Sequence, residues 1–136
     1  MIAKTALAGM ALILSLAVGP AFAGVCLDKS MTPDEIVDAI NATSSCERAM
    51  KLFEACEFGT GGAIRLGAAV ETKCERDIRT GLNAAQKALY QREMLICDRK
   101  YRNETGTMYL SFTAFCRAEV AQRYSRRALK AAGTTR

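Results

Sequence analysis

The chain lacks histidine and tryptophan, and only two of its 136 residues are prolines. Without histidine, neither a Ser-His-Asp nor a Cys-His catalytic arrangement can be built. A zinc site needs closely spaced ligand pairs, usually with histidine, and a redox site typically has the Cys-x-x-Cys spacing, which is absent. These absences disfavour most catalytic designs, so we expect no enzyme activity, no metal and no cofactor.

Paired carboxylates are the remaining route to acid–base chemistry, as in glycosidases. The acidic residues of this chain have basic neighbours at helical spacing, and acidic side chains are mostly exposed in proteins. We therefore interpret them as charged helix surface. The candidate carboxylates are Glu47, Glu71, Glu75, Asp77 and Glu93.

Residues 1–23 have the pattern of a cleaved signal peptide. Lys4 precedes an apolar stretch over 5–18, and Ala21-Phe22-Ala23 matches a small-x-small cleavage site. An uncleaved anchor is disfavoured because this stretch is too short, and lipid attachment at Cys26 is disfavoured because the residues before it match a lipobox poorly. No later apolar run approaches the roughly 20 residues that cross a bilayer. We expect a soluble, periplasmic protein with one domain over 24–136.

Six cysteines follow the signal segment, and an even count in a small secreted chain predicts a disulfide framework. They are Cys26, Cys46, Cys56, Cys74, Cys97 and Cys116. The composition around them is helical, because strand-like alternation is absent while Ala, Glu, Lys, Arg, Leu and Gln are abundant. The expected fold is therefore all-α: a small bundle of about four helices in hairpins, held together by three disulfides.

The expected helices have recognisable starts and ends. Thr32-Pro33-Asp34-Glu35 begins the first as a capping box with proline at the first helical position, and it ends near Asn41. A second box at 44–47 begins the next helix, which Gly59-Thr60-Gly61-Gly62 ends. A helical region over 63–103 contains Gly67 and Gly81 as candidate breaks, and a last helix spans about 108–131, closed by Gly133.

Apolar residues at helical spacing predict which side of each helix is buried. The expected buried stripes are Ile36/Val37/Ile40, Cys46/Ala49/Met50/Phe53/Cys56, Tyr90/Met94/Cys97/Tyr101 with an adjoining Leu82/Ala85/Leu89, and Phe112/Phe115/Cys116/Val120/Tyr124.

Helical hairpins narrow the 15 pairings that six cysteines permit. Cys97 and Cys116 lie at similar distances from the turn near Gly106, so they face each other at similar height. Cys46 and Cys74 are related in the same way by the glycine-rich turn at 59–62. The remaining pair is Cys26 with Cys56. The predicted set is 26–56, 46–74 and 97–116.

Charge is concentrated near the C-terminus. The segment 24–136 has a net charge of +4, whereas 117–136 alone has +5. A basic helix end favours acidic partners, such as lipid headgroups or anionic polymer, although a solvated helix face explains the same residues. Nucleic acid is a disfavoured partner for an exported protein. The candidate binding residues are Arg117, Arg123, Arg126, Arg127 and Lys130.

One region resembles a known family. Gln86-Lys87-Ala88-Leu89 is followed by Cys97, then Gly106-Thr107-Met108 and Cys116. Together with Arg126-Arg127 and Leu129, these residues resemble the lysozyme-inhibitor LprI-like family of small bacterial envelope proteins. The resemblance covers about 74–129, roughly half of the expected mature chain. It departs from the family at three motifs: Leu89 replaces a tryptophan, Thr105-Gly106-Thr107 replaces Gly-Gly-Ser, and Arg92-Glu93 replaces Arg-Asp.

The resemblance implies a helical, disulfide-bonded envelope protein that could inhibit a lysozyme-type enzyme. Animal lysozymes are strongly cationic, so a chain of positive net charge would meet them with like charge unless an acidic face dominates locally. Asp34, Glu35 and Asp38 could form such a face. The simpler interpretation is that they complement the N-terminal dipole of the first helix.

Overall fold

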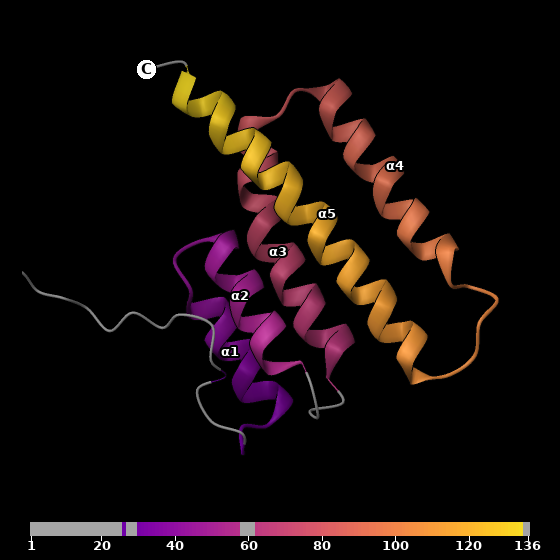
Figure 1. Ribbon diagram of the computed structural model, residues 1–136. Helices are drawn as coiled ribbons and strands as arrows, with labels where there is room; N and C mark the ends of the chain where they lie inside the picture. Colours follow the sequence, from indigo (N-terminus) through magenta and orange to yellow (C-terminus); the bar gives the residue numbers. More distant parts are fainter. Residues whose placement is uncertain (1–25, 27–29, 58–61, 135–136) are drawn as a thin grey trace, which may run out of the picture.

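The computed structural model describes Cys26 and residues 30–57 and 62–134, so the expected signal segment at 1–23 lies outside the described residues. Within them the protein is all-helical and contains no strand, as the composition predicts. The described residues form five helices, one more than the roughly four expected. They are α1 (Pro33–Ala42), α2 (Cys46–Cys56), α3 (Ala63–Gly81), α4 (Ala84–Lys100) and α5 (Thr107–Thr134) (Figure 1).

The additional helix arises because the region expected over 63–103 divides in two. The break follows Gly81, one of the two glycines expected to interrupt it, whereas Gly67 lies inside α3. Asn83 is the N-cap of α4: its side-chain oxygen accepts from the N–H of Gln86, at 2.9 Å, and the Gln86 side chain accepts from the N–H of Asn83, at 3.0 Å. This capping box satisfies two backbone donors that would otherwise lack partners, so it fixes the start of α4.

The other helix ends agree closely with the pattern. Thr32, the residue before Pro33, forms the expected capping box with Glu35. The N-cap of α2 is Ser45 rather than Ser44, and its side chain accepts from the N–H of Arg48. Gly133 does not close the last helix, which runs through it to Thr134. A single helical glycine costs only about 1 kcal/mol, so α5 can continue across it.

All three disulfides have the predicted pairing. The Cα–Cα distances are 4.8 Å for Cys26–Cys56, 4.6 Å for Cys46–Cys74 and 5.6 Å for Cys97–Cys116. The second bond joins α2 to α3 and the third joins α4 to α5, so each fixes one helical hairpin. Three disulfides are compatible with an extracellular or periplasmic protein.

Helix α3 forms the centre of the molecule and runs parallel to α5. Gly67 lies against Ala114, and Gly81 lies against Ala128, at corresponding positions along the two helices. A Cβ atom at Gly67 would be 3.1 Å from the Cβ of Ala114, and one at Gly81 would be 2.8 Å from that of Ala128. Both glycines therefore allow the two backbones to approach closely.

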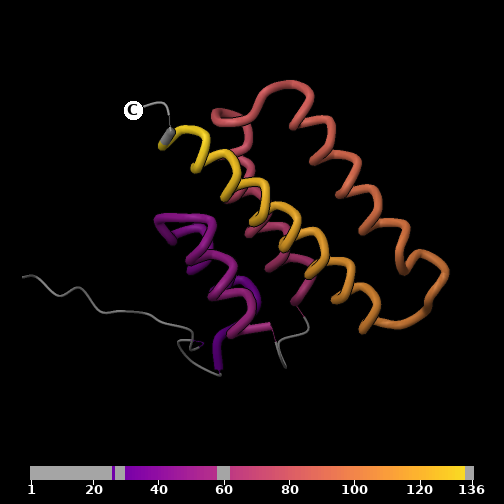
Figure 2. Tube along the Cα trace, turned by 45° about the horizontal axis from the view of Figure 1, so that its top comes forward, coloured from indigo at the N-terminus to yellow at the C-terminus, as the bar shows by residue number. Residues whose placement is uncertain are grey.

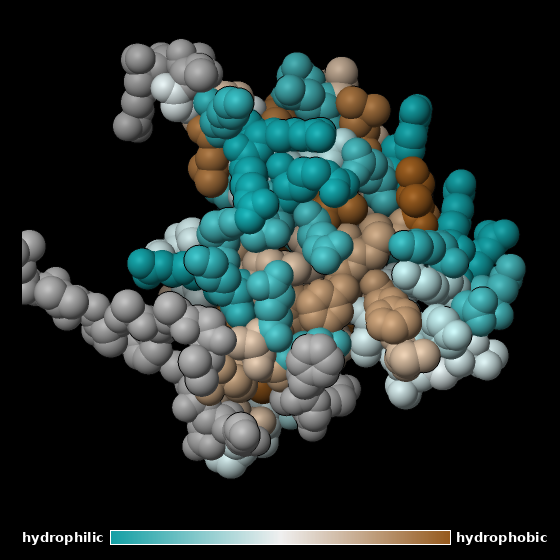
Figure 3. Space-filling model, viewed as in Figure 1, coloured by the Kyte–Doolittle hydropathy of each residue, from teal (hydrophilic) through white to brown (hydrophobic). Residues whose placement is uncertain are grey.

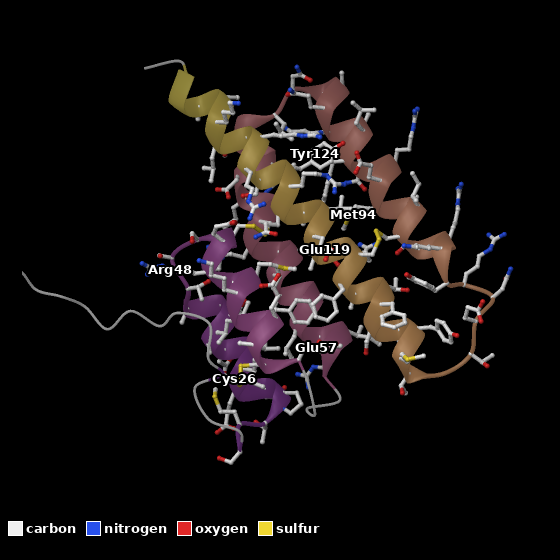
Figure 4. All side chains as sticks on the ribbon, in the orientation of Figure 1. Cys26, Arg48, Glu57, Met94, Glu119 and Tyr124 are labelled. Carbon is white, nitrogen blue, oxygen red and sulfur yellow. A yellow bond between two sulfur atoms is a disulfide. The ribbon has the colours of Figure 1, made fainter. Side chains whose placement is uncertain are left out.

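Helices α1 and α2 cover one side of this pair, and α4 lies at the opposite edge beside α5 (Figures 1 and 2). Most of the contacts of α4 are with α5. Tyr90, Met94 and Cys97 form its buried face, as predicted, and Figure 4 shows Met94 and Tyr124 between the two helices. The adjoining stripe is wrong in part, because Leu82 is buried whereas Ala85 and Leu89 are exposed. Phe112, expected inside, is 43% exposed.

Lys73 is a buried cation that no sequence motif marked. Its ammonium group donates to the carbonyl oxygens of Asn41 and Thr43, at 2.6 and 2.8 Å. These carbonyls lie at the end of α1, where the last turn leaves acceptors without helical partners. The lysine therefore links the end of α1 to the middle of α3.

Candidate binding surface

The five basic residues expected to bind an acidic partner are all on α5, and the structure engages them within the protein. Arg117 connects three helices: its Nε and Nη2 donate to the two carboxylate oxygens of Glu71, both at 2.9 Å, and its Nη1 donates to Asp98 at 2.7 and 2.8 Å. The hydrogen bonds to Glu71 contribute most to raising the pKa of Arg117. The Arg117 side chain, 29% exposed, is engaged by carboxylates of both α3 and α4.

Two further arginines on α5 form ion pairs with neighbouring helices. Arg126 pairs with Glu47 of α2, which also accepts from Gln122 at 2.8 Å. Arg123 pairs with Glu93 of α4, which also accepts from the hydroxyl of Tyr124.

The pKa values of both carboxylates reflect these contacts. Hydrogen bonding from Arg126 lowers the pKa of Glu47, and hydrogen bonding from Tyr124, followed by that from Arg123, lowers the pKa of Glu93. Both groups therefore remain ionised at neutral pH and keep their pairs with α5.

The last two predicted residues also have partners. The guanidinium of Arg127 lies 4.6 Å from the ring centroid of Tyr124, which is a cation–π contact. Lys130 is exposed and interacts within the chain. The structure thus brings four arginines and one lysine onto one helix, as expected, but contacts inside the protein occupy them. Their role in binding stays a prediction.

The candidate carboxylates have a role that their sequence pattern did not indicate. Each of the five accepts a hydrogen bond from another helix, and each is half-buried rather than a fully exposed surface group. Glu75 accepts from Tyr90 of α4, for example, at 2.9 Å, and burial is the largest contribution to raising the pKa of that tyrosine. The pairs are Glu47–Arg126, Glu71–Arg117, Glu75–Tyr90, Asp77–Ser125 and Glu93–Arg123. These contacts hold helices together.

The acidic residues of α1 are also engaged in part. Asp34 pairs with Arg65 of α3, and Glu35 forms the capping box with Thr32.

Among the described residues there is no group of three His, Cys, Asp or Glu side chains that could hold a metal ion. No helix in the same part of the chain is long and apolar enough to cross a membrane.

A second candidate surface, not predicted above, lies on α4. Leu89, Leu95 and Ile96 are 48%, 50% and 57% exposed, and Arg92 and Arg99 are exposed between them. The intervals of three and four residues place all five on one side of the helix. Arg102, in the turn that follows, continues the series at the next interval of three. We call Leu89, Arg92, Leu95, Ile96, Arg99 and Arg102 the α4 outer face.

The charges of the α4 outer face are unbalanced. Arg92, Arg99 and Arg102 make no ion pair with any residue that the structure describes. The two acidic residues of α4, Glu93 and Asp98, are both paired with arginines of α5. The face therefore contains cations and aliphatic side chains but no acid. In Figure 3 brown and teal side chains alternate along this edge of the molecule.

A signal for this surface is present in the sequence. Leu95 and Ile96 lie outside the stripe of Tyr90, Met94, Cys97 and Tyr101, so they cannot share its buried side. The helix is apolar on its buried side and partly apolar on the other, which is unusual for a helix at the edge of a small domain.

No family model, curated protein or solved structure matches this chain. The resemblance to the lysozyme-inhibitor LprI-like family therefore stays a prediction that depends on the motifs between Cys74 and Leu129. The geometry of the described residues is the basis for the function proposed below.

Proposed function

We propose that this protein is an exported, non-catalytic binding protein of the cell envelope, and that it binds an acidic envelope component through the α4 outer face. The observation that carries this proposal is the contrast between two helices. On α5, Arg117, Arg123 and Arg126 form ion pairs within the protein, whereas Arg92, Arg99 and Arg102 are exposed and without ion pairs among the described residues.

The attraction of an anion depends on which charges near the surface are already paired. A charge already paired with a carboxylate offers little net field to a partner, and separating the pair has a cost. Three guanidinium groups that form no ion pair with a described residue attract anions, and arginine can bind a phosphate or carboxylate with two parallel hydrogen bonds. Arg99 also complements the C-terminal dipole of α4, but the dipole falls off within the last turn and does not account for Arg92.

The test uses immobilised heparin, a polyanion without exposed aliphatic groups, and the oxidised chain without residues 1–23. We expect the variant Arg92/Arg99/Arg102→Gln to elute at clearly lower salt than the wild type, because screening weakens exposed charge contacts. The matched control is Arg48/Arg76/Arg79→Gln, which removes the same charge from exposed positions on α2 and α3. It should elute near the wild type. Equal losses in both variants would refute a binding surface on α4.

Lysozyme inhibition, which the resemblance implies, stays a prediction of partner identity. The acidic face suggested on α1 is weakened as a contact for a cationic enzyme, because Asp34 and Glu35 already have partners within the chain. A panel of purified lysozymes assayed with the oxidised protein tests it directly. Inhibition that persists in the Arg92/Arg99/Arg102→Gln variant would place the inhibitory surface away from α4.

A further inference from the structure

We infer that the acidic component is the surface of a lipid bilayer rich in anionic lipid, and that the α4 outer face lies on it with Leu89, Leu95 and Ile96 inserted at the boundary between headgroups and acyl chains. This inference rests on the proposed function, because it names the partner of the same surface. Its basis is the exposure of the three aliphatic side chains, which an acidic polymer would leave in water.

The exposed aliphatic residues indicate which kind of acidic partner fits this face. A polyanion could satisfy Arg92, Arg99 and Arg102, but it would leave three half-exposed aliphatic side chains in water. A bilayer surface satisfies both groups, since guanidinium groups remain at headgroup phosphates on long flexible stems while Leu and Ile reach the apolar boundary. The absence of an acidic side chain from this face removes the repulsion that an anionic headgroup would otherwise meet.

The position of α4 allows such a contact. It lies at one edge of the molecule, with most of its contacts to α5, so its outer side is not covered by another described helix (Figures 1 and 2). The Cys97–Cys116 bond and the hydrogen bonds of Arg117 to Asp98 hold the buried side of α4 against α5. The helix is therefore held in a fixed orientation before it meets the membrane, and no helix needs to fold on binding.

A second copy of the chain is a poorer occupant. Two α4 outer faces brought together would place three arginines, none in an ion pair with a described residue, against three others, and like charges at an interface disfavour association. The same charges favour a surface with many phosphates. The face therefore discriminates against self-association and in favour of an anionic bilayer.

The experiment is cosedimentation of the oxidised protein, residues 24–136, with vesicles of phosphatidylglycerol and phosphatidylcholine, and with vesicles of phosphatidylcholine alone. We expect binding only to the vesicles that contain phosphatidylglycerol. The variant Leu89/Leu95/Ile96→Gln should bind these vesicles at least about tenfold more weakly while its retention on heparin is unchanged. The control Ile64/Leu129→Gln removes aliphatic groups that are equally exposed, both 54%, from α3 and α5, and should bind like the wild type.

The outcomes separate the two proposals. Retention on heparin without vesicle binding would overturn the lipid assignment and leave an acidic polymer or protein as the partner. Vesicle binding that the aliphatic triple variant retains would overturn the inserted arrangement. Failure of the wild type to bind either heparin or vesicles would refute the proposed function itself. Circular dichroism of each variant confirms that the helical fold is intact before binding is compared.

Discussion

Replacing Cys46 and Cys74 together with alanine is expected to lower the free energy of unfolding by about 2–5 kcal/mol, the range for losing a native disulfide from a small secreted domain. Both cysteines are almost completely buried, at 3% and 0% exposure, and their bond fixes α2 against the central helix α3. The substitution therefore removes a constraint on the unfolded chain and also leaves a space in the core. Urea unfolding under non-reducing conditions measures the effect.

The Cys26–Cys56 bond is the control for this prediction. The two bonds span similar lengths of chain, with sequence separations of 28 and 30 residues, so the effect of each on the unfolded chain is similar. Cys26 is only half-buried, and its removal leaves a smaller space. The Cys26/Cys56→Ala variant should therefore lose less stability. A larger loss in that variant would contradict the packing of α2 against the central helix α3.

Replacing Gly67 with leucine is expected to destabilise the protein by about 3 kcal/mol, near the upper end of the usual cost of overpacking. A Cβ atom at this position would lie 3.1 Å from the Cβ of Ala114 and 3.2 Å from its carbonyl oxygen. The rest of a leucine side chain has no space between α3 and α5, so the two parallel helices must separate. Thermal and urea unfolding of the oxidised variant measure the loss.

Gly133 provides a matched substitution on α5. A Cβ atom there meets nothing within 4 Å, and leucine has a better helix propensity than glycine. The Gly133→Leu variant should be as stable as the wild type or slightly more so. Similar effects of the two substitutions would contradict the close approach of α3 and α5.

Local patterns predicted much of the fold. The disulfide pairing could be predicted because helix rise and turn position determine which cysteines lie at the same height in a hairpin. The cap at Thr32 could be predicted because a capping box is a short-range signal. The break after Gly81 was one of two predicted from the glycines at 67 and 81, but the capping box of Asn83 and Gln86 that fixes the start of α4 was not predicted.

The partners of the charged residues could not be predicted in the same way. Arg117 meets Glu71 across 46 residues of sequence, and Arg126 meets Glu47 across 79. Such pairs depend on which helices are neighbours and on the parallel alignment of α3 with α5. The basic end of the chain therefore suggested a binding surface on α5, where Arg117, Arg123 and Arg126 form ion pairs with other helices. None of the three arginines of the α4 outer face forms an ion pair with a described residue. The net charge of the C-terminal segment was counted correctly from the sequence, but that count did not indicate which cations form ion pairs with acidic residues of other helices.

The absence of tryptophan from the sequence allows the most direct test of a membrane-bound α4. A single Ile96→Trp substitution places the only indole of the protein on the α4 outer face, and Leu129→Trp places one at a similarly exposed site on α5. With vesicles that contain phosphatidylglycerol, we predict that the emission of the Ile96→Trp protein shifts to the blue and is protected from an aqueous quencher, because the indole enters the boundary of the acyl chains. The emission of the Leu129→Trp protein should stay unchanged. A blue shift in the Leu129→Trp protein with none in the Ile96→Trp protein would contradict the account.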